Sequence, residues 1–140
     1  MSYDPNNIFA KILRGEAPCI RIFEDDQTLV IMDIMPQSEG HVLVLTKEAA
    51  AQIFELSEQG AAACMRTARK AALAVKAALA PAGVILAQAN GAAAGQTVPH
   101  LHVHVIPRRE GQFLAMHAAK PADPAELRQI AERIRAAWPT

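Results

Sequence analysis

The sequence lacks any long uninterrupted apolar run, and none approaches the roughly 20 residues that a membrane-spanning helix requires. It also lacks an excess of charge of either sign, because 14 basic residues balance 14 acidic ones. A neutral chain is not expected to bind nucleic acid or an anionic membrane by general electrostatic attraction, although a local site can still bind one small anion. We therefore predict neither nucleic acid nor a membrane as a partner.

Export and metal-binding signals are lacking as well. The N-terminal stretch MSYDPNNIFAKILRG has neither the apolar core nor the cleavage pattern of a signal peptide. The two cysteines, Cys19 and Cys64, stand in no spacing typical of metal ligands and are expected to stay reduced. A chain of 140 residues, 51% of them hydrophobic, is long enough to bury a core as one domain. These features predict a single-domain cytoplasmic protein.

Hydrophobic periodicity and turn residues predict an α+β domain with an antiparallel sheet. An apolar stripe that includes Met65, Ala68 and Val75 is expected to face the core from the long helix. Asp123, followed by Pro124 and Glu126, is typical of a helix start. In chain order, the predicted elements are a helix from residue 8 to before Gly15, strands over 19–25, 28–34 and 41–46, a helix over about 49–80, strands over 84–90 and 99–109, and a helix over about 123–137.

The segment PHLHVHVIPRR, residues 99–109, carries His100, His102 and His104 at alternate positions. Side chains alternate across a strand, so the three histidines are predicted to share one face while Leu101 and Val103 pack into the core on the other. Histidines can simply line a solvated face. Three in strict alternation beside a glycine-containing loop favour a shared chemical role instead.

A metal site is one alternative for the histidines, because neutral imidazole is a common ligand and His102 with His104 could chelate one ion. Strand geometry opposes it, since at about 3.3 Å per residue the Cα atoms of the outer pair lie roughly 13 Å apart. No carboxylate stands nearby at an obvious ligand spacing. We therefore predict no metal and no cofactor.

Nucleophilic attack on phosphorus is the favoured alternative. A neutral imidazole attacks through one ring nitrogen when the other keeps its proton on a fixed acceptor, and His102 has histidines on both sides. Unperturbed pKa values near ~6.5 would let one histidine act as nucleophile and another as acid at neutral pH. The preceding loop fits this chemistry, because Gly95 permits close backbone approach and Gln96 and Thr97 supply donors for phosphate oxygens.

These residues resemble the histidine triad (HIT) superfamily. HLHVHVI matches its His-x-His-x-His signature, and NIFAKILRGEAP, IFEDDQTLVIMDIMPQSEGHVLVLTK and NGAAAGQTVPHLHVHVIPR resemble it in order and spacing, from about residue 7 to 109. The first block is similar to the histidine triad nucleotide-binding (Hint-like) branch rather than to diadenosine polyphosphate hydrolases. The resemblance implies a HIT-like fold, a five-stranded antiparallel sheet with helices packed on it, whose sheets join across a homodimer.

The resemblance also implies an activity and a set of site residues. A purine nucleotide phosphoramidase or hydrolase would release nucleoside monophosphate through a phosphohistidine on His102, with His104 at the phosphate and leaving group and His100 ordering the site. His41 resembles the family's fourth histidine, near the same network. The implied substrate contacts are Asn90, Gly95, Gln96 and Thr97 at the phosphate, Asp33 at the ribose, and Ile8, Phe9, Ile12, Met32 and Ile34 around the base. A diadenosine polyphosphate hydrolase and a nucleotide-binding scaffold with incidental turnover stay open as alternatives.

Other readings of the same residues, and departures from the family pattern, also bear on the site. By themselves Ile8, Phe9 and Ile12 are typical of core packing, and Asp33 of a turn cap. Some relatives carry a zinc-binding cysteine pair where this chain has Asn7 and Ala10, so no structural zinc is expected. Beyond residue 109 the chain does not match the short tail of the better-known members and has a helix instead, as an extension of the single HIT domain.

Overall fold

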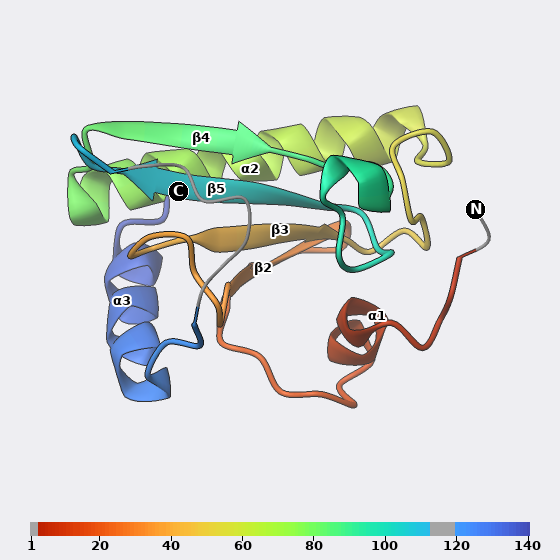
Figure 1. The fold of residues 1–140 in the computed structure, drawn as a ribbon, viewed down its shortest axis with the longest axis horizontal. Helices are drawn as coiled ribbons and strands as arrows, with labels where there is room; N and C mark the ends of the chain where they lie inside the picture. Colours follow the sequence, from red (N-terminus) through yellow and green to blue (C-terminus); the bar gives the residue numbers. More distant parts are fainter. Residues whose placement is uncertain (1–2, 113–119) are drawn as a thin grey trace.

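The computed structural model describes residues 3–112 and 120–140, and within them it shows a five-stranded sheet covered by helices (Figure 1). The strand order is β1-β2-β3-β5-β4, and every neighbouring pair is antiparallel, as predicted. Part of the loose stretch expected before Pro121, residues 113–119, lies outside the described residues. The elements are α1 (Ile8–Leu13), β1 (Arg21–Glu24), β2 (Thr28–Met32), β3 (Val42–Thr46), α2 (Glu58–Leu79), β4 (Gly83–Ala87), the 3-10 turn η1 (Ala92–Ala94), β5 (His102–Arg108) and α3 (Pro124–Ala136).

Short polar side chains set several element boundaries where the sequence predicts them. The side chain of Asn7 accepts the Ala10 N–H at the start of α1, and Asp123 does the same for Ala125 at the start of α3. In the β1–β2 hairpin, Asp25 Oδ1 accepts the N–H groups of Gln27 and Thr28. These local bonds explain why the predictions for both short helices and for the two strands of this hairpin are confirmed.

The long helix begins later than its alanine content predicts. Residues 49–57 form turns, and α2 starts at Glu58 because Ser57 is its cap and accepts the Gly60 N–H. Glu48 reinforces this start by accepting both the N–H and the hydroxyl of Ser57. The prediction that Met65 belongs to the apolar stripe is wrong. Met65 is 58% exposed, and Cys64 and Ala68 lie on the buried face of α2 instead.

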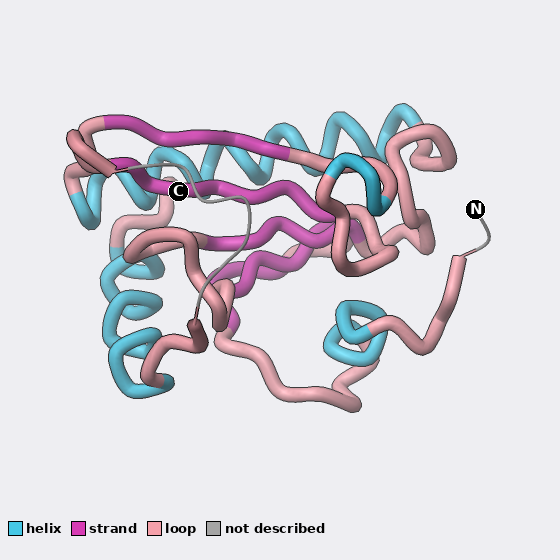
Figure 2. Tube along the Cα trace, in the orientation of Figure 1, coloured by secondary structure: helices cyan, strands magenta, loops and turns pink. Residues whose placement is uncertain are grey.

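The two faces of the sheet carry different cores, and Figure 2 shows the backbone of the strands and helices that form them. One face packs against α2 and α3 through alternate aliphatic side chains, including Val44, Val103 and Val105. The other face is smaller and packs against α1, with Phe9, Leu43 and Leu45 in its cluster. The predicted alternation of β5 is therefore confirmed, and its histidines lie on the smaller face.

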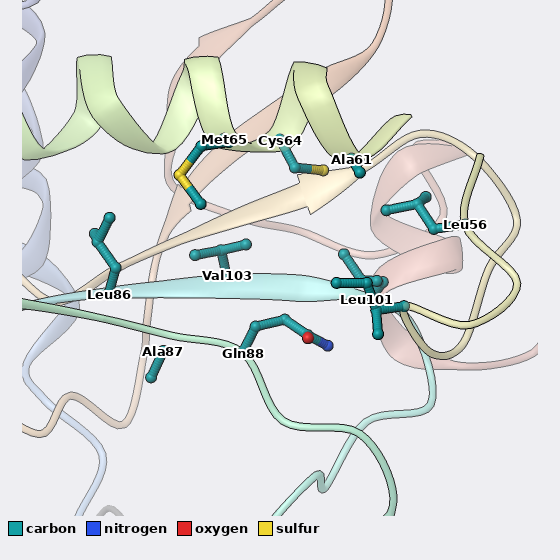
Figure 3. Close-up of a pocket in the computed structure, with 10 residues that line it drawn as sticks. Leu56, Ala61, Cys64, Met65, Leu86, Ala87, Gln88, Leu101 and Val103 are labelled. Atoms are coloured by element: carbon teal, nitrogen blue, oxygen red, sulfur yellow. The ribbon is translucent and has the colours of Figure 1, made fainter. Parts of the chain in front are cut away.

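The outer edge of β4 forms an apolar surface beside α2. A hollow of about 140 Å³ lies between these elements, lined among others by Met65 and Leu86, as Figure 3 shows. Phe54, in the turns before α2, is 80% exposed. Because β4 pairs with β5 alone, its second edge has no strand beside it among the described residues. None of the helices in the described chain is long and apolar enough to cross a membrane.

Candidate active site

Four histidines converge on the α1 side of the sheet. In the β3–β5 ladder, His102 pairs with Leu45 and His104 with Leu43, and both rings rise beside one another with centroids 4.9 Å apart. His41 immediately precedes β3, and its ring centroid lies 5.2 Å from that of His104. His41 therefore lies beside the triad, as predicted, although His41 and His104 are 63 positions apart in the sequence.

The ring of His102 has only one neutral form compatible with its hydrogen bond. Its Nδ1 lies 2.6 Å from the backbone oxygen of His100. A carbonyl oxygen only accepts, so Nδ1 carries the hydrogen and Nε2 keeps its lone pair. Phe9 packs edge-on against the same ring, with centroids 4.9 Å apart. His102 is therefore held with a basic nitrogen free for attack, as the nucleophilic interpretation requires.

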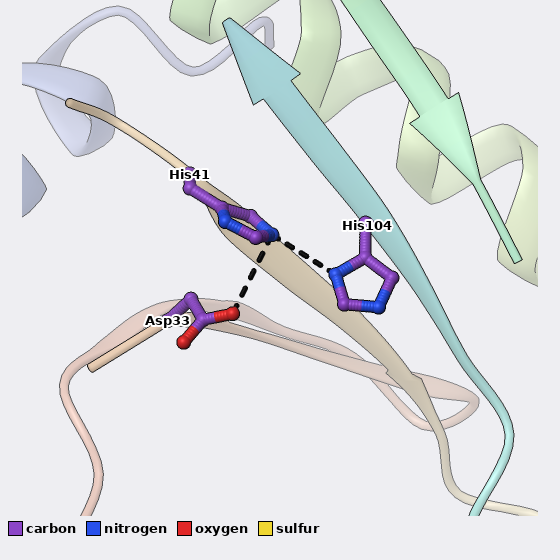
Figure 4. Close-up of side chains that lie close together, drawn as sticks. All are labelled: Asp33, His41 and His104. Carbon is purple, nitrogen blue, oxygen red and sulfur yellow. Dashed lines mark hydrogen bonds and ion pairs between the residues drawn. The ribbon is translucent and has the colours of Figure 1, made fainter. Parts of the chain in front are cut away.

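His41 and His104 form a directed hydrogen-bond chain. The Gln37 N–H donates to His41 Nδ1 at 3.0 Å, so the hydrogen of a neutral His41 ring sits on Nε2. That Nε2–H donates to His104 Nδ1 at 2.9 Å, as Figure 4 shows. His104 consequently carries its own hydrogen on Nε2. This series of hydrogen bonds ends at His104 Nε2–H, a donor on the ring next to His102.

Burial keeps these imidazoles neutral. Desolvation first, and then the charges of His104 and His102, lower the pKa of His41 to about 3, and desolvation with His102 lowers the pKa of His104 to about 4. The pKa values of His100 and His102 are also lowered, chiefly by burial. The expectation of an acid with an unperturbed histidine pKa is therefore wrong for this arrangement. At neutral pH the resting rings are therefore uncharged, and each keeps one N–H group as a hydrogen-bond donor.

Asp33 lies at the edge of this cluster. Its Oδ1 accepts the Met35 N–H at 2.8 Å, so it does cap a turn, and its Oδ2 lies 3.5 Å from His41 Nε2. Burial raises the pKa of the Asp33 carboxyl. Because His41 is neutral near pH 7, the contact between them is not a full ion pair.

Asp33, His41 and His104 also place one ligand atom each within 4.8 Å of one another, a spacing open to a metal ion. A metal on His41 Nε2 would move the ring hydrogen to Nδ1, where it would oppose the Gln37 N–H. The cluster therefore fits a hydrogen-bond relay better than a metal site. Where the sequence comparison placed Asn7 and Ala10, the side chain of Asn7 caps α1 and Ala10 offers no ligand atom.

The loop before β5 is built on backbone contacts of polar side chains. Gln96 accepts the Gly91 N–H and donates to the backbone oxygens of Ala51 and Val98. Asn90 accepts the Ile53 N–H at 2.8 Å and exchanges hydrogen bonds with Gln88.

The conformation of Gly95, rather than the space around it, explains its place in this loop. Its φ of 97° lies in the left-handed region, and a Cβ there would meet nothing within 4 Å. The left-handed backbone conformation is therefore one reason for a glycine at this position. Thr97, two residues after Gly95, is exposed near the start of the histidine segment.

The hydrophobic residues expected around the base divide between the two faces. Phe9 touches the histidines, Ile12 packs with the smaller core, and Ile8 and Ile34 are exposed. Met32 is a wrong prediction, because it lies on the opposite face in the core beneath α2 and α3. Strand alternation is the reason: Ile31, one residue earlier, takes the histidine face.

Comparison with known proteins gives consistent matches. The HIT domain family matches residues 14–111. The adenosine 5'-monophosphoramidase hnt1 of Schizosaccharomyces pombe is 36% identical over 129 residues, covering 91% of this chain and 94% of that protein. The adenylylsulfatase HINT3 of Arabidopsis thaliana is 40% identical over 108 residues, covering 76% of this chain and 54% of its own. A HIT-like protein from Bartonella henselae superposes with a TM-score of 0.91 at 41% identity, covering 97% and 99% of the two chains.

Proposed function

Because the chain belongs to the HIT domain family and is a nucleotide hydrolase of the histidine triad type, we propose that it cleaves purine nucleotides at the α-phosphate. The products are a nucleoside monophosphate and an amine or related leaving group. The reaction proceeds through a phosphohistidine on His102. The observation that carries this proposal is the hydrogen bond from His102 Nδ1 to the His100 carbonyl, which leaves Nε2 free.

The covalent step follows from the ring positions. The lone pair of His102 Nε2 attacks phosphorus, a P–N bond forms, and the bond from phosphorus to the leaving group breaks. The leaving group takes its proton from His104 Nε2–H, while the His41 Nε2–H bond to His104 Nδ1 stabilises the change. Water then attacks phosphorus and gives one proton to His104 Nε2, which restores the proton that His104 lost. The P–N bond breaks, its electron pair returns to His102 Nε2, and nucleoside monophosphate leaves. These steps require no metal or other cofactor.

The remaining site residues are proposed as substrate contacts. Asp33 accepts the ribose hydroxyls through its Oδ2, and Phe9 with its α1 neighbours Ile8 and Ile12 lies against the base. Ile34 adds to this wall. Asn90, Gly95, Gln96 and Thr97 hold the phosphate. The role proposed for Gln96 is to hold the loop in shape, and its side-chain bonds to the backbone of Gly91 and Ala51 support that role.

The first experiment compares the turnover of adenosine 5'-phosphoramidate, adenosine 5'-phosphosulfate and diadenosine tetraphosphate, with EDTA present. We expect AMP release fastest from the phosphoramidate, and loss of that release in His102→Ala. Preference for diadenosine tetraphosphate would assign the chain to the dinucleotide hydrolases instead. Tight AMP binding with negligible turnover of all three substrates would favour a nucleotide-binding scaffold, and full activity in His102→Ala would refute the phosphohistidine.

We also propose that the chain is one HIT domain, with α3 as its extension, and that it acts as a cytoplasmic homodimer joined at β4. The unpaired edge of β4 and the exposed apolar side chains of Met65, Leu86 and Phe54 support a second copy there. Two-fold pairing of this edge would extend each sheet into the other and cover the hollow in Figure 3. The triad lies on the other face of β5.

Sedimentation tests the dimer. The chain has a mass of 15.0 kDa, so we expect a species of roughly 30 kDa. Met65→Glu places a charge on the proposed interface and is expected to give monomers. Ala77→Glu adds the same charge at an exposed position of α2 roughly 120° around the helix from Met65, so it is the matched control and should leave the dimer intact. A wild-type monomer at micromolar concentration would contradict this proposal.

A further inference from the structure

Tyr3 is the only tyrosine of the chain, and no part of the proposed mechanism uses it. Its hydroxyl lies 2.6 Å from His100 Nδ1, across 97 residues of sequence. The two rings meet edge-on, with centroids 5.6 Å apart. The N-terminal segment therefore reaches the first histidine of the triad directly.

The opposite side of the His100 ring determines the direction of this hydrogen bond. His100 Nε2 lies 2.7 Å from the backbone oxygen of Thr46 at the end of β3, and a carbonyl oxygen can only accept. The ring hydrogen is consequently on Nε2, and Nδ1 is an acceptor. The Tyr3 O–H donates to it. With both nitrogens bonded and the residue only 1% exposed, the ring has one orientation and one tautomer.

The backbone of His100 links its fixed ring to His102, the proposed nucleophile. Its carbonyl oxygen is the acceptor that holds the hydrogen on His102 Nδ1. Phe9 touches both rings, edge-on to His100 with centroids 6.2 Å apart and edge-on to His102. Tyr3 thus joins three parts of the site: the N-terminal segment before α1, the end of β3, and the carbonyl that sets the His102 tautomer.

Separate bonds anchor the N-terminal segment itself. Asn7 donates from its side chain to the Asp4 carbonyl, and Arg14 Nη1 donates to the Pro5 carbonyl at 2.7 Å. The segment can therefore stay folded without the Tyr3 hydroxyl. The role of the Tyr3 hydroxyl can therefore be tested separately from the tether, the Arg14–Pro5 hydrogen bond that holds the segment.

We propose that Tyr3 is a positioning residue of the active site, whose hydroxyl locks the His100 ring and so keeps His102 in its attacking tautomer. The inference rests on the proposed function for its kinetic consequence, and on geometry alone for the state of the rings. Without the hydroxyl, a buried Nδ1 acceptor has no partner, and the His100 ring gains alternative orientations. The carbonyl that fixes His102 then becomes less well placed.

The kinetic test is Tyr3→Phe, which keeps the ring and removes the oxygen. We expect kcat for the phosphoramidate to fall about tenfold, with KM changed less than threefold, because an ordering effect on the nucleophile acts on the chemical step. Arg14→Ala, which releases the tether but keeps the hydroxyl, should lower kcat less than twofold. Unchanged kcat in Tyr3→Phe, or an equal loss in Arg14→Ala, would overturn the proposal.

A double-variant cycle identifies the route of the effect. If Tyr3 acts through His100, then Tyr3→Phe should lower kcat no further in a His100→Asn background. Full additivity of the two losses would contradict a route through His100.

Nitrogen NMR of the resting protein supplies a readout that needs no turnover. In the wild type, His100 should show a hydrogen on Nε2 only and His102 a hydrogen on Nδ1 only. Tyr3→Phe should mix or broaden these signals, whereas Arg14→Ala should preserve them. Identical ring signals in wild type and Tyr3→Phe would refute the proposal. An inactive wild type with the expected NMR change would refute the proposed function alone.

Discussion

The two faces of β5 have different roles. On the α2 side, Val103 and Val105 pack with aliphatic neighbours through hydrophobic contacts, which are not directional. On the α1 side, His102 and His104 are bonded through particular ring nitrogens to particular partners. Burial on the first face contributes stability in proportion to the apolar area removed from water. Burial on the second fixes tautomers and excludes charge.

This difference predicts a separation between stability and activity along a single strand. Residues of the aliphatic face should influence the free energy of unfolding with little effect on the chemical step. Residues of the histidine face should act mainly on the chemical step when the new side chain keeps the hydrogen bonds that satisfy the buried polar atoms of the described chain. Neighbouring positions of β5 then serve as controls for one another.

The largest expected effect is that of His102→Asn. The asparagine amide can still donate to the His100 carbonyl, but it offers phosphorus no basic nitrogen. We expect kcat to fall by at least about a thousandfold while the free energy of unfolding changes by less than about 1 kcal/mol. Steady-state kinetics and urea unfolding measure the two quantities. If His102→Asn lost stability as well as activity, the two faces of β5 would not differ in the way proposed.

The converse variant is Val105→Ala on the aliphatic face. Val105 is fully buried between Val42 and Leu86, so removing two methyl groups should lower the free energy of unfolding by about 2 kcal/mol. We expect kcat to stay within twofold of the wild type at 25 °C. A tenfold drop in kcat of the folded variant would show that packing beneath β5 also tunes the histidines.

The sequence predicts the alternation of β5 because a period of two is a local property of a strand. Caps such as Asn7 and Asp123 are also predictable, since each bonds its own neighbours. The start of α2 is not, because alanine-rich turns and helix look alike until Ser57 and Glu48 meet.

Tertiary contacts account for the other failures. The face of Met32 depends on register within β2, and the single tautomers depend on carbonyl and N–H groups brought in by β3 and the loops. Tyr3 gives no signal in the sequence at all. Its partner stands 97 residues away, and only the fold brings the two together.

The histidine face should also make stability depend on pH. The folded pKa of His41 is about 3, below the ordinary value of 6.5, so the unfolded chain binds the proton first as pH falls. Stability is therefore full above about pH 7 and is lost below pH 6.5, by up to about 1.4 kcal/mol per pH unit for this residue. Urea unfolding at pH 7, 6 and 5 should show a shallower slope in His41→Asn. Val105→Ala should keep the wild-type slope, and parallel slopes for all three proteins would contradict this account.

The smallest expected effect lies at the border between the faces, where Asp33 follows the core residue Met32 and turns toward His41. Asp33→Ala removes the proposed acceptor of the ribose hydroxyls and leaves the His102 and His104 bonds in place. Affinity for AMP should weaken about tenfold, equal to about 1.4 kcal/mol, while affinity for 2',3'-dideoxy-AMP stays nearly constant. Equal weakening for both nucleotides, measured by calorimetry, would remove Asp33 from the ribose and leave it as a support for His41. In that outcome Asp33 would belong with the residues that order the histidine face, and the boundary of the binding site would lie nearer to α1.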